Sequence, residues 1–194
     1  QGQRRLARSG TPAERTGVVT SFALGPALLF CPADRPDRYR KALDRADAVI
    51  LDLEDAVTAE RRPAAREAMV ANPLDPERVI VRLNAYETAD FADDLAALQQ
   101  TPYRYVILAK ASPEADFARL RPSSVVALCE TAEAITQIDR IAAAPPVTAL
   151  MLGAEDLVAS MGGTSSRGPT GYFRSVVSHA RAILALAAAV HGVA

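Results

Sequence analysis

Residues 125–156 read VVALCETAEAITQIDRIAAAPPVTALMLGAED, and this stretch decides the fold. An apolar run at 125–129 is followed by Glu130, a helical segment and a second apolar run at 147–152. This order predicts a β-α-β unit with parallel strands. Because parallel strands bring their C-terminal ends to the same edge of a sheet, we expect Glu130 and Asp156 to meet there.

Two carboxylates that meet at a sheet edge suggest a site for a hard divalent cation. Mg2+ suits such a pair because it takes oxygen ligands, is usually held by one or two protein carboxylates and keeps water or substrate in its other positions. The alternative is that Glu130 and Asp156 only cap the helices that follow them. The spacing alone leaves both interpretations open, and the rest of the chain favours the metal.

Apolar runs of strand length recur along the whole chain and are continuous rather than alternating, as in strands that are buried on both faces. They lie at 27–30, 48–53, 79–83, 105–108, 125–129 and 147–152. Helices are expected between and after them, at 36–45, 61–71, 90–99, 113–120, 132–143 and 172–191. A repeat of about twenty to thirty residues is the β/α period of a barrel or of an open doubly wound sheet.

Polar residues follow almost every one of these strands, which favours a barrel over a sheet with a single switch point. They are Asp34, Arg35, Asp52, Glu54, Asp55, Arg82, Asn84, Lys110, Glu130, Glu155 and Asp156. No G-x-G-x-x-G follows the first strand, so a dinucleotide fold loses support. We therefore predict an α/β fold of the (β/α)8 TIM-barrel class. Only six β/α units are visible in 194 residues, whereas such a barrel needs about 250, so the last two units are expected to be missing from the chain as given.

Composition and charge indicate a single soluble domain. The net charge of −1 implies neither a nucleic-acid nor an acidic-membrane partner. The apolar run at 182–190 is far too short to cross a bilayer, which takes about 20 residues. Cys31 and Cys129 each end an apolar run without C-x-x-C spacing, so they are interpreted as reduced core thiols of a cytoplasmic protein.

The first 24 residues are expected to lie outside this domain. Residues 1–21 contain four arginines against one acid and have no apolar segment of the kind a secretory signal requires. We interpret residues 1–24 as a disordered leader or an expression remnant, with an organellar transit peptide as a less favoured alternative. Residues 25–194 are predicted to form the catalytic domain, C-terminally incomplete.

Three acids, Asp52, Glu54 and Asp55, end the second strand. Acids this close repel one another unless they are paired with arginine, share the waters of a cation or are partly protonated. The alternative is a solvated acidic turn that caps a helix. Arg82, at the end of the third strand, could grip a carboxylate with both arms of its guanidinium group or form a salt bridge to these acids, and both roles can hold at once.

The segment 153–157 is expected to open a short helix, and its free N–H groups at Ala154 and Glu155 could bind an anionic part of a substrate next to the metal. The glycine-rich loop 162–168 could touch phosphates of a large substrate, although a plain connection is favoured. His179 and His191 both fall in the last helix, away from the strand ends. A histidine base or a histidine metal site is therefore not expected.

Five motifs taken together resemble the citrate lyase β-subunit family, within the aldolase/citrate lyase superfamily. They are LFCPADRP at 29–36, LDLEDAV at 51–57, VRLNA at 81–85, LCETA at 128–132 and GAEDL at 153–157. The resemblance runs from about residue 25 to the end of the chain. It implies a TIM barrel, usually a homotrimer, that binds Mg2+ and cleaves or forms a C–C bond between a keto acid and an acyl thioester.

The resemblance also implies roles for individual residues. Glu130 and Asp156 match the metal ligands, with Glu130 also close to the substrate, and Arg82 matches the arginine that holds the keto-acid carboxylate. The acids around metal-bound water would be Asp52, Glu54 and Asp55. Pyruvate-type aldolases of the superfamily carry a histidine where Asp55 stands, which argues for the thioester-lyase branch.

The expected function is therefore a Mg2+-dependent carbon-carbon lyase. Its substrate would be a β-hydroxyacyl-CoA such as malyl-CoA or citramalyl-CoA, and its products an acyl-CoA and a keto acid such as oxaloacetate, pyruvate or glyoxylate. The alternatives are a metal-dependent pyruvate-type aldolase and a non-catalytic keto-acid-binding subunit that needs an acyl-carrier partner.

The catalytic base has no convincing candidate in this chain. In relatives it is a carboxylate from a C-terminal segment of a neighbouring subunit. Ala109-Lys110 departs from the Pro-Lys of the family, which leaves the role of Lys110 open.

Overall fold

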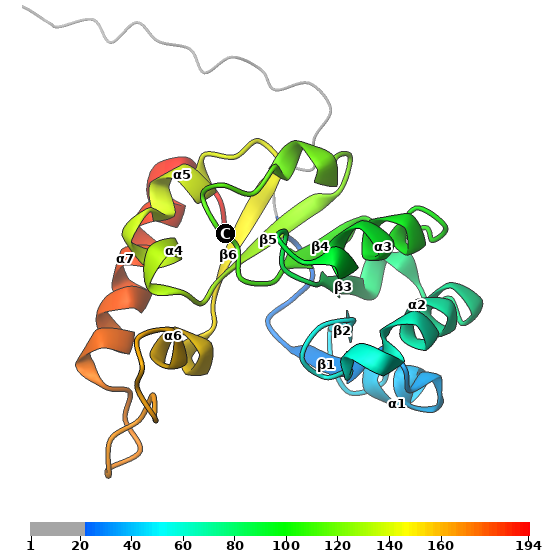
Figure 1. Cartoon of the computed structure of the whole chain (residues 1–194), viewed down its shortest axis with the longest axis horizontal. Coiled ribbons are helices and arrows are strands. Elements are labelled where there is room, and N and C mark those ends of the chain that lie inside the picture. Colours follow the sequence, from blue (N-terminus) through cyan, green and yellow to red (C-terminus); the bar gives the residue numbers. More distant parts are fainter. Residues whose placement is uncertain (1–21) are drawn as a thin grey trace, which may run out of the picture.

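The computed structural model describes residues 22–194 and contains one parallel sheet of six strands. The strands are β1 (Leu28–Pro32), β2 (Ala48–Asp52), β3 (Val79–Leu83), β4 (Tyr105–Leu108), β5 (Ser124–Cys129) and β6 (Val147–Leu152). They lie side by side in the order β1-β2-β3-β4-β5-β6, the same as their order in the chain (Figure 1). The sequential order means that every crossover runs in the same direction, as in a TIM barrel.

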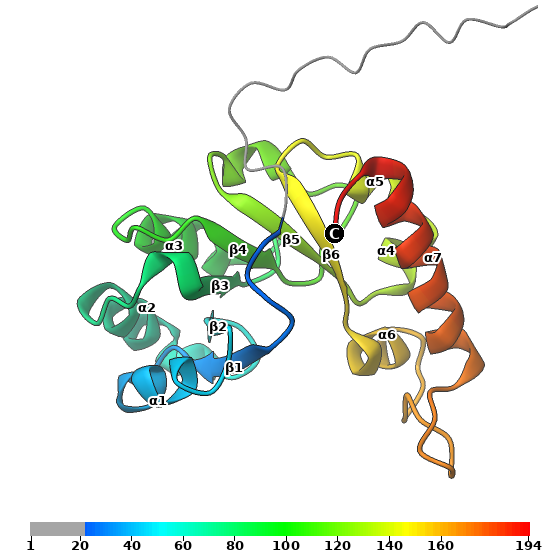
Figure 2. The same cartoon turned by 180° about the vertical axis from the view of Figure 1, so that it is seen from behind.

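Helices cover only the outer side of this sheet (Figures 1 and 2). The α-helices are α1 (Tyr39–Leu43), α2 (Arg62–Ala71), α3 (Ala89–Leu98), α4 (Ala132–Thr136), α5 (Ile138–Ala142), α6 (Ala154–Ser160) and α7 (Ser175–His191). Short 3-10 helices are η1 (Pro36–Arg38), η2 (Ala59–Arg61), η3 (Pro76–Arg78) and η4 (Phe117–Leu120). The predicted α/β barrel class is confirmed as a six-stranded, partial TIM-barrel-like fold.

Strands β2 to β5 are buried on both faces, as their continuous apolar sequences predict, whereas β1 at the edge of the sheet is partly exposed. Alternate residues of each strand separate into two clusters. The outer cluster, between sheet and helices, includes Val49, Leu51, Val81 and Leu108. The inner cluster fills the barrel interior and contains Leu24, Ala48, Ile50, Ile80, Tyr105, Ile107, Val126, Leu128 and Ala149.

This alternation also decides which side chains reach the mouth of the barrel. Asp52 is two residues beyond Ile50, Arg82 two beyond Ile80 and Glu130 two beyond Leu128, so all three continue the inner rows. In β6 a register irregularity opposite Val125 and Val126 shifts the alternation by one residue. As a result Ala149 faces inward while Val147 and Leu150 face the helices.

Two of the expected helices differ from the structure. Where residues 113–120 were predicted to be helical, only the 3-10 helix η4 forms, because Pro113 and Asp116 favour turns and Asp116 caps η4 through the N–H of Ala118. The helix predicted at 132–143 is broken at Gln137, whose φ of −119° and ψ of 26° separate α4 from α5.

The start of the described chain packs against the barrel. Leu24 is buried in the inner cluster, and the ring of Phe22 meets that of Tyr105 edge-on, with centroids 6.3 Å apart. The rest of the predicted leader, residues 1–21, lies outside the described residues. Cys31 and Cys129 are free and buried, as expected. No helix within residues 22–194 has the length and apolar composition needed to span a membrane.

Candidate metal centre at the carboxyl ends of the strands

The strand register pairs Asp52 with Arg82. These residues are direct neighbours in the β2–β3 ladder, and both side chains point inward. Arg82 donates from Nε to Asp52 Oδ1 at 2.8 Å and from Nη2 to Oδ2 at 2.6 Å. Asp52 is fully buried and Arg82 is 8% exposed. The arginine therefore forms the structural salt bridge that was one of its two predicted roles.

Glu54 lies between two cations. Its Oε2 is 2.9 Å from Arg82 Nη1, without the alignment of a hydrogen bond, and its Oε1 accepts from Lys110 Nζ. Burial raises the pKa of Glu54, whereas the hydrogen bond from Lys110 and the charge of Arg82 oppose the shift. Asp55 is more exposed and lies 3.8 Å from Arg82 Nη1. The three acids thus avoid repulsion mainly by pairing with Arg82 and Lys110.

Glu130 and Asp156 come together, as the sequence predicts. Glu130 is 2% exposed, and its Oε1 accepts the backbone N–H of Lys110 at 2.9 Å. Its pKa is raised to about 7, first because the group is buried and then because Asp156 hydrogen-bonds to it and carries like charge, while the Lys110 N–H opposes the shift. A cation held by the two carboxylates would take the place of the proton that Glu130 otherwise keeps up to about pH 7.

The donor set fits a hard cation. Glu130 and Asp156 offer carboxylate oxygens at the mouth of the barrel, and Mg2+ is usually held by one or two protein carboxylates with water completing its shell. No cluster of three or more His, Cys, Asp or Glu side chains suited to a metal occurs in residues 22–194. A closed, all-protein site of the structural zinc type is therefore not formed in this part of the chain.

Gly153 is a residue whose role the sequence alone did not reveal. It lies between β6 and α6, and a Cβ placed on it would lie 2.6 Å from Glu130 Cβ. Any side chain at position 153 would push Glu130 away from Asp156. The only sequence signal was the glycine within the GAEDL motif.

Phe30 is another residue whose place at this site the sequence did not predict. It is 44% exposed in the middle of β1, and its ring centroid lies 4.9 Å from the guanidinium carbon of Arg82. It shares the inward orientation of Leu28, which packs on the inner cluster. An exposed aromatic ring thus flanks Arg82. The sequence did not predict this, because an apolar residue within a strand is usually read as part of the core.

Helix α6 begins at Ala154 beside this pair of carboxylates, with Glu155 and Asp156 in its first turn. In the first turn of a helix N–H groups lack intrahelical acceptors, so the N–H groups of Ala154 and Glu155 face the end of β6. The Glu155 side chain turns away and accepts from Ser166 Oγ at 2.5 Å, which ties the 162–168 loop to α6.

Three predicted polar groups lie outside the cluster. Asn84 donates to Leu53 O and to Asp94, so its side chain joins β3 to β2 and α3. Asp34 pairs with Arg61 at 2.6 Å. Arg35 pairs with Asp37 on the surface. His179 and His191 are in α7, as expected, and His191 lies 3.2 Å from Asp139.

Comparisons with known proteins define the class. The model of the HpcH/HpaI aldolase/citrate lyase family matches residues 27–111 and 108–194. The chain therefore belongs to this family, and the resemblance seen in the five motifs is confirmed.

Within the family, the chain is similar to citrate lyase subunit β-like proteins. It is 52% identical over 170 residues to the one from Mycobacterium tuberculosis, covering 88% of this chain and 62% of that protein. It is 32% identical over 173 residues to the L-malyl-CoA/β-methylmalyl-CoA lyase of Cereibacter sphaeroides, covering 73% of this chain and 54% of the lyase. The chain thus spans less than two thirds of the length of these relatives.

A solved structure of Mycobacterium tuberculosis CitE in complex with magnesium, acetoacetate and coenzyme A superposes with a TM-score of 0.85. It is 51% identical in sequence, with 88% of this chain and 64% of that chain covered. Other structures of that protein contain magnesium with oxaloacetate or with pyruvate.

Proposed function

We propose that this protein is a Mg2+-dependent carbon-carbon lyase of the citrate lyase β-like type. Its substrate would be a β-hydroxyacyl-CoA such as malyl-CoA or citramalyl-CoA, and its products an acyl-CoA and a keto acid. The observation that carries the proposal is the buried Glu130 carboxylate in contact with Asp156, directly above the barrel interior. The lyase relative and the CitE complexes support the choice of reaction and of Mg2+.

Glu130 and Asp156 would hold the metal, and Gly153 and the Lys110 N–H keep Glu130 in position. Bound Mg2+ would supply Lewis-acid stabilisation of the negative charge on the β-hydroxyl oxygen, which becomes the keto oxygen of the product when the C–C bond breaks and its electron pair passes to the acyl-CoA part. Asp52 and Glu54 are held by cations. Neither is therefore suited to take the β-hydroxyl proton. We assign that role to a carboxylate of a C-terminal segment outside residues 1–194, which a neighbouring subunit of a homotrimer would contribute.

Arg82 would orient the keto acid. Three of its five N–H donors face Asp52 and Glu54, which fixes the plane of the guanidinium group. The remaining donors can bind a substrate carboxylate next to the metal, and the Phe30 ring shields that contact from water. The first-turn N–H groups of Ala154 and Glu155 would bind a second anionic oxygen of the substrate.

A pocket beside Phe30 supports the thioester part of the proposal. It has a volume of about 370 Å3 and is bordered by Arg38, Lys41 and Arg45. None of these three cations has an ion pair within residues 22–194. The phosphates of a CoA molecule could bind there while its thioester reaches past Phe30 toward Arg82.

The first test is calorimetric titration of oxaloacetate, pyruvate and glyoxylate with and without Mg2+, followed by assays of malyl-CoA and citramalyl-CoA cleavage. We expect keto-acid binding only with Mg2+, and CoA-dependent cleavage. Cleavage of a hydroxy-keto acid without CoA would indicate a pyruvate-type aldolase. Keto-acid binding without any turnover by the full-length protein alone would indicate a subunit that needs an acyl-carrier partner.

Variants test the metal ligands separately. Glu130→Gln and Asp156→Asn should each weaken Mg2+ binding at least about tenfold, since each removes a charged ligand. Glu133→Gln, an exposed carboxylate change on α4, is the matched control and should leave Mg2+ affinity unchanged. If both ligand variants bind Mg2+ as the wild type does, the site assignment is wrong.

A further inference from the structure

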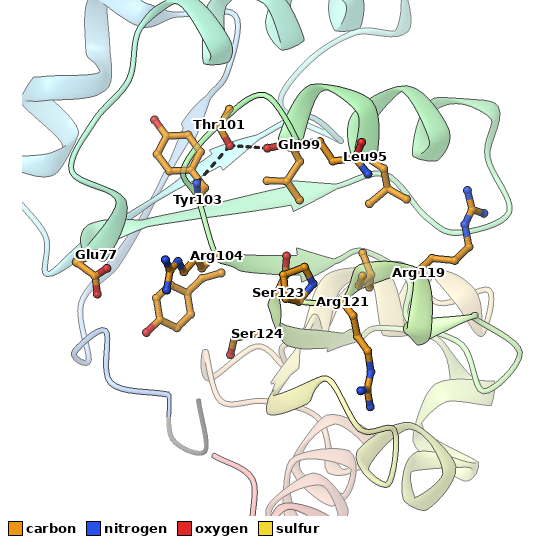
Figure 3. A pocket seen from close by; sticks show the side chains of 14 residues that line it. Glu77, Leu95, Gln99, Thr101, Tyr103, Arg104, Arg119, Arg121, Ser123 and Ser124 are labelled. Atoms are coloured by element: carbon orange, nitrogen blue, oxygen red, sulfur yellow. Dashed lines mark hydrogen bonds between the residues drawn. The ribbon is translucent and has the colours of Figure 1, made fainter. Parts of the chain in front are cut away.

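The helix layer is thin outside β4 and β5. The connection between these strands contains only the four-residue 3-10 helix η4, whereas β2–β3 and β3–β4 are joined through the ten-residue helices α2 and α3. A cavity of about 610 Å3 lies there, between the end of α3 and the residues that lead into β4 and β5 (Figure 3). Its size is in the range of small-molecule sites.

This cavity is at the opposite end of the strands from the candidate metal centre. Ser124, the first residue of β5, borders the cavity, and Glu130 follows the last residue of the same strand. Six residues of extended chain separate the two by about 20 Å. The cavity is therefore a separate site that the lyase proposal leaves unused.

The charge around the cavity is strongly positive. Arg104, Arg119 and Arg121 border it, against the single carboxylate of Glu77. Within the described part of the chain, none of these arginines forms an ion pair. By contrast, Arg82 is held by carboxylates. The cavity thus has a surplus of two positive charges that is not neutralised by described residues.

The three arginines lie at different places around the cavity. Figure 3 shows Arg104 near Glu77, and Arg119 and Arg121 on the opposite side, toward η4. Arg119 is partly held in place because its guanidinium carbon lies 5.2 Å from the Phe91 ring centroid. Arg104 and Arg121 have no such contact among the described residues, so their donors are available to a ligand.

The remaining walls are partly apolar and partly hydroxylated. Leu95, Leu98 and Leu120 form the apolar part. Thr101 and Ser123 contribute hydroxyl groups, and Figure 3 shows them between α3 and the start of β5. This lining suits a molecule with a doubly charged anionic group and a compact organic body.

We propose that this cavity binds a small organic phosphate. Arg104 and Arg121 bind the phosphate oxygens, because planar guanidinium groups match phosphate geometry and the dianion balances the surplus charge. The organic part packs against Leu95, Leu98 and Leu120. A monocarboxylate such as pyruvate or glyoxylate would leave half of the surplus charge unbalanced, which is why phosphate is favoured over these two keto acids.

The test is calorimetric titration of AMP, pyrophosphate and adenosine into the protein in EDTA at low salt. We expect AMP and pyrophosphate to bind and adenosine to bind at least about tenfold more weakly. The double variant Arg104→Gln/Arg121→Gln should weaken AMP binding at least about tenfold. Arg181→Gln, which removes an arginine from α7 without an ion pair in the described chain, is the control and should bind AMP as the wild type does.

A second variant distinguishes an effect of charge in the cavity from a loss of the folded structure. Ser123→Glu places a carboxylate among the arginines at a partly exposed position, and it should abolish AMP binding while Mg2+ and keto-acid binding at the other end stay within about twofold of wild type. The proposal is wrong if AMP does not bind, if both cavity variants still bind AMP, or if AMP binding and Mg2+ binding fall together. The last outcome would mean that the phosphate binds at the other end, near Arg38 and Lys41, or that the variants disturb the fold.

Discussion

At the scale of single residues, Arg82 carries two tasks with one side chain. It neutralises the buried Asp52 and approaches Glu54, and in the proposed function its remaining donors hold a keto acid. A buried carboxylate left without its partner is costly. A change at position 82 therefore tests both tasks at once, and the two need separate readouts.

Arg82→Lys should weaken keto-acid binding at least about tenfold while Mg2+ affinity changes by less than about twofold, because lysine keeps the charge but lacks the fork. Calorimetry of both ligands measures this difference. Arg78→Lys is a matched control, since Arg78 donates only to the carbonyl groups of Leu43, Ala46 and Asp47. Equal losses of Mg2+ and keto-acid affinity in Arg82→Lys would assign Arg82 a structural role alone.

Lys110 has a backbone conformation that only glycine adopts freely. Its φ is +47°, and this left-handed turn aims its N–H at Glu130 while its side chain reaches Glu54. The residue thus links β2 and β5 across the mouth of the barrel. These contacts give Lys110, whose role the sequence left open, a structural role; the departure from the family pattern is at the preceding residue, Ala109.

Lys110→Gly should be more stable than Lys110→Ala by about 1 kcal/mol, because both lose the contact with Glu54 but only alanine keeps the left-handed strain. Urea unfolding of the two variants measures the difference. At an ordinary exposed position, the alanine variant would be more stable than the glycine variant. Alanine equal to or better than glycine at position 110 would show that the strain is absent.

At the scale of elements, the junction of β6 and α6 brings Asp156 to Glu130. The strand ends at Leu152, the helix begins at Ala154, and Gly153 between them has no side chain to separate the two carboxylates. The junction is therefore as important to the site as the ligands themselves.

Gly153→Ala should weaken Mg2+ binding at least about tenfold while far-UV circular dichroism stays unchanged, because the added methyl group displaces Glu130. Gly163→Ala is the control, since a Cβ there would lie 2.6 Å from Val158 Cγ1, away from both carboxylates. It should lower stability without changing Mg2+ affinity. Mg2+ affinity that falls equally in both variants would contradict the specific role of Gly153.

At the scale of the whole molecule, the proton that Glu130 binds in the folded protein links stability to pH. The pKa of Glu130 in the folded protein is about 7, above its ordinary value of 4.5. The folded state therefore binds this proton more tightly than the unfolded state does. The resulting stabilisation is complete below about pH 4.5 and is lost as the pH rises through 7.

In EDTA, the wild type should lose on the order of 3 kcal/mol of unfolding free energy relative to Glu130→Gln between pH 4.5 and pH 8. Urea unfolding across this range, with both proteins side by side, measures the difference. Adding Mg2+ at pH 8 should restore stability to the wild type only, since the cation replaces the proton. Parallel pH profiles for the two proteins would show that Glu130 does not bind its proton more tightly in the folded state than in the unfolded state.

The barrel class, the six strands and the meeting of Glu130 with Asp156 were all predictable from the sequence. Each follows from local patterns: continuous apolar runs, their spacing, and acids placed directly after strands. Less of the helix layer was predictable. Residues 113–120 have helical composition, yet only η4 forms, and Gln137 breaks the helix expected at 132–143.

The sequence by itself determined which residues stand at the carboxyl edge of the sheet, because strand period and chain order depend only on neighbouring residues. Only the tertiary structure decided how they are paired. The β2–β3 register joins Arg82 to Asp52, and the left-handed turn at Lys110 holds Glu130, across gaps of 30 and 20 residues. The arginine-lined cavity also depends on the tertiary structure, because it lies where two segments do not pack against each other. No local sequence pattern encodes a space between two segments.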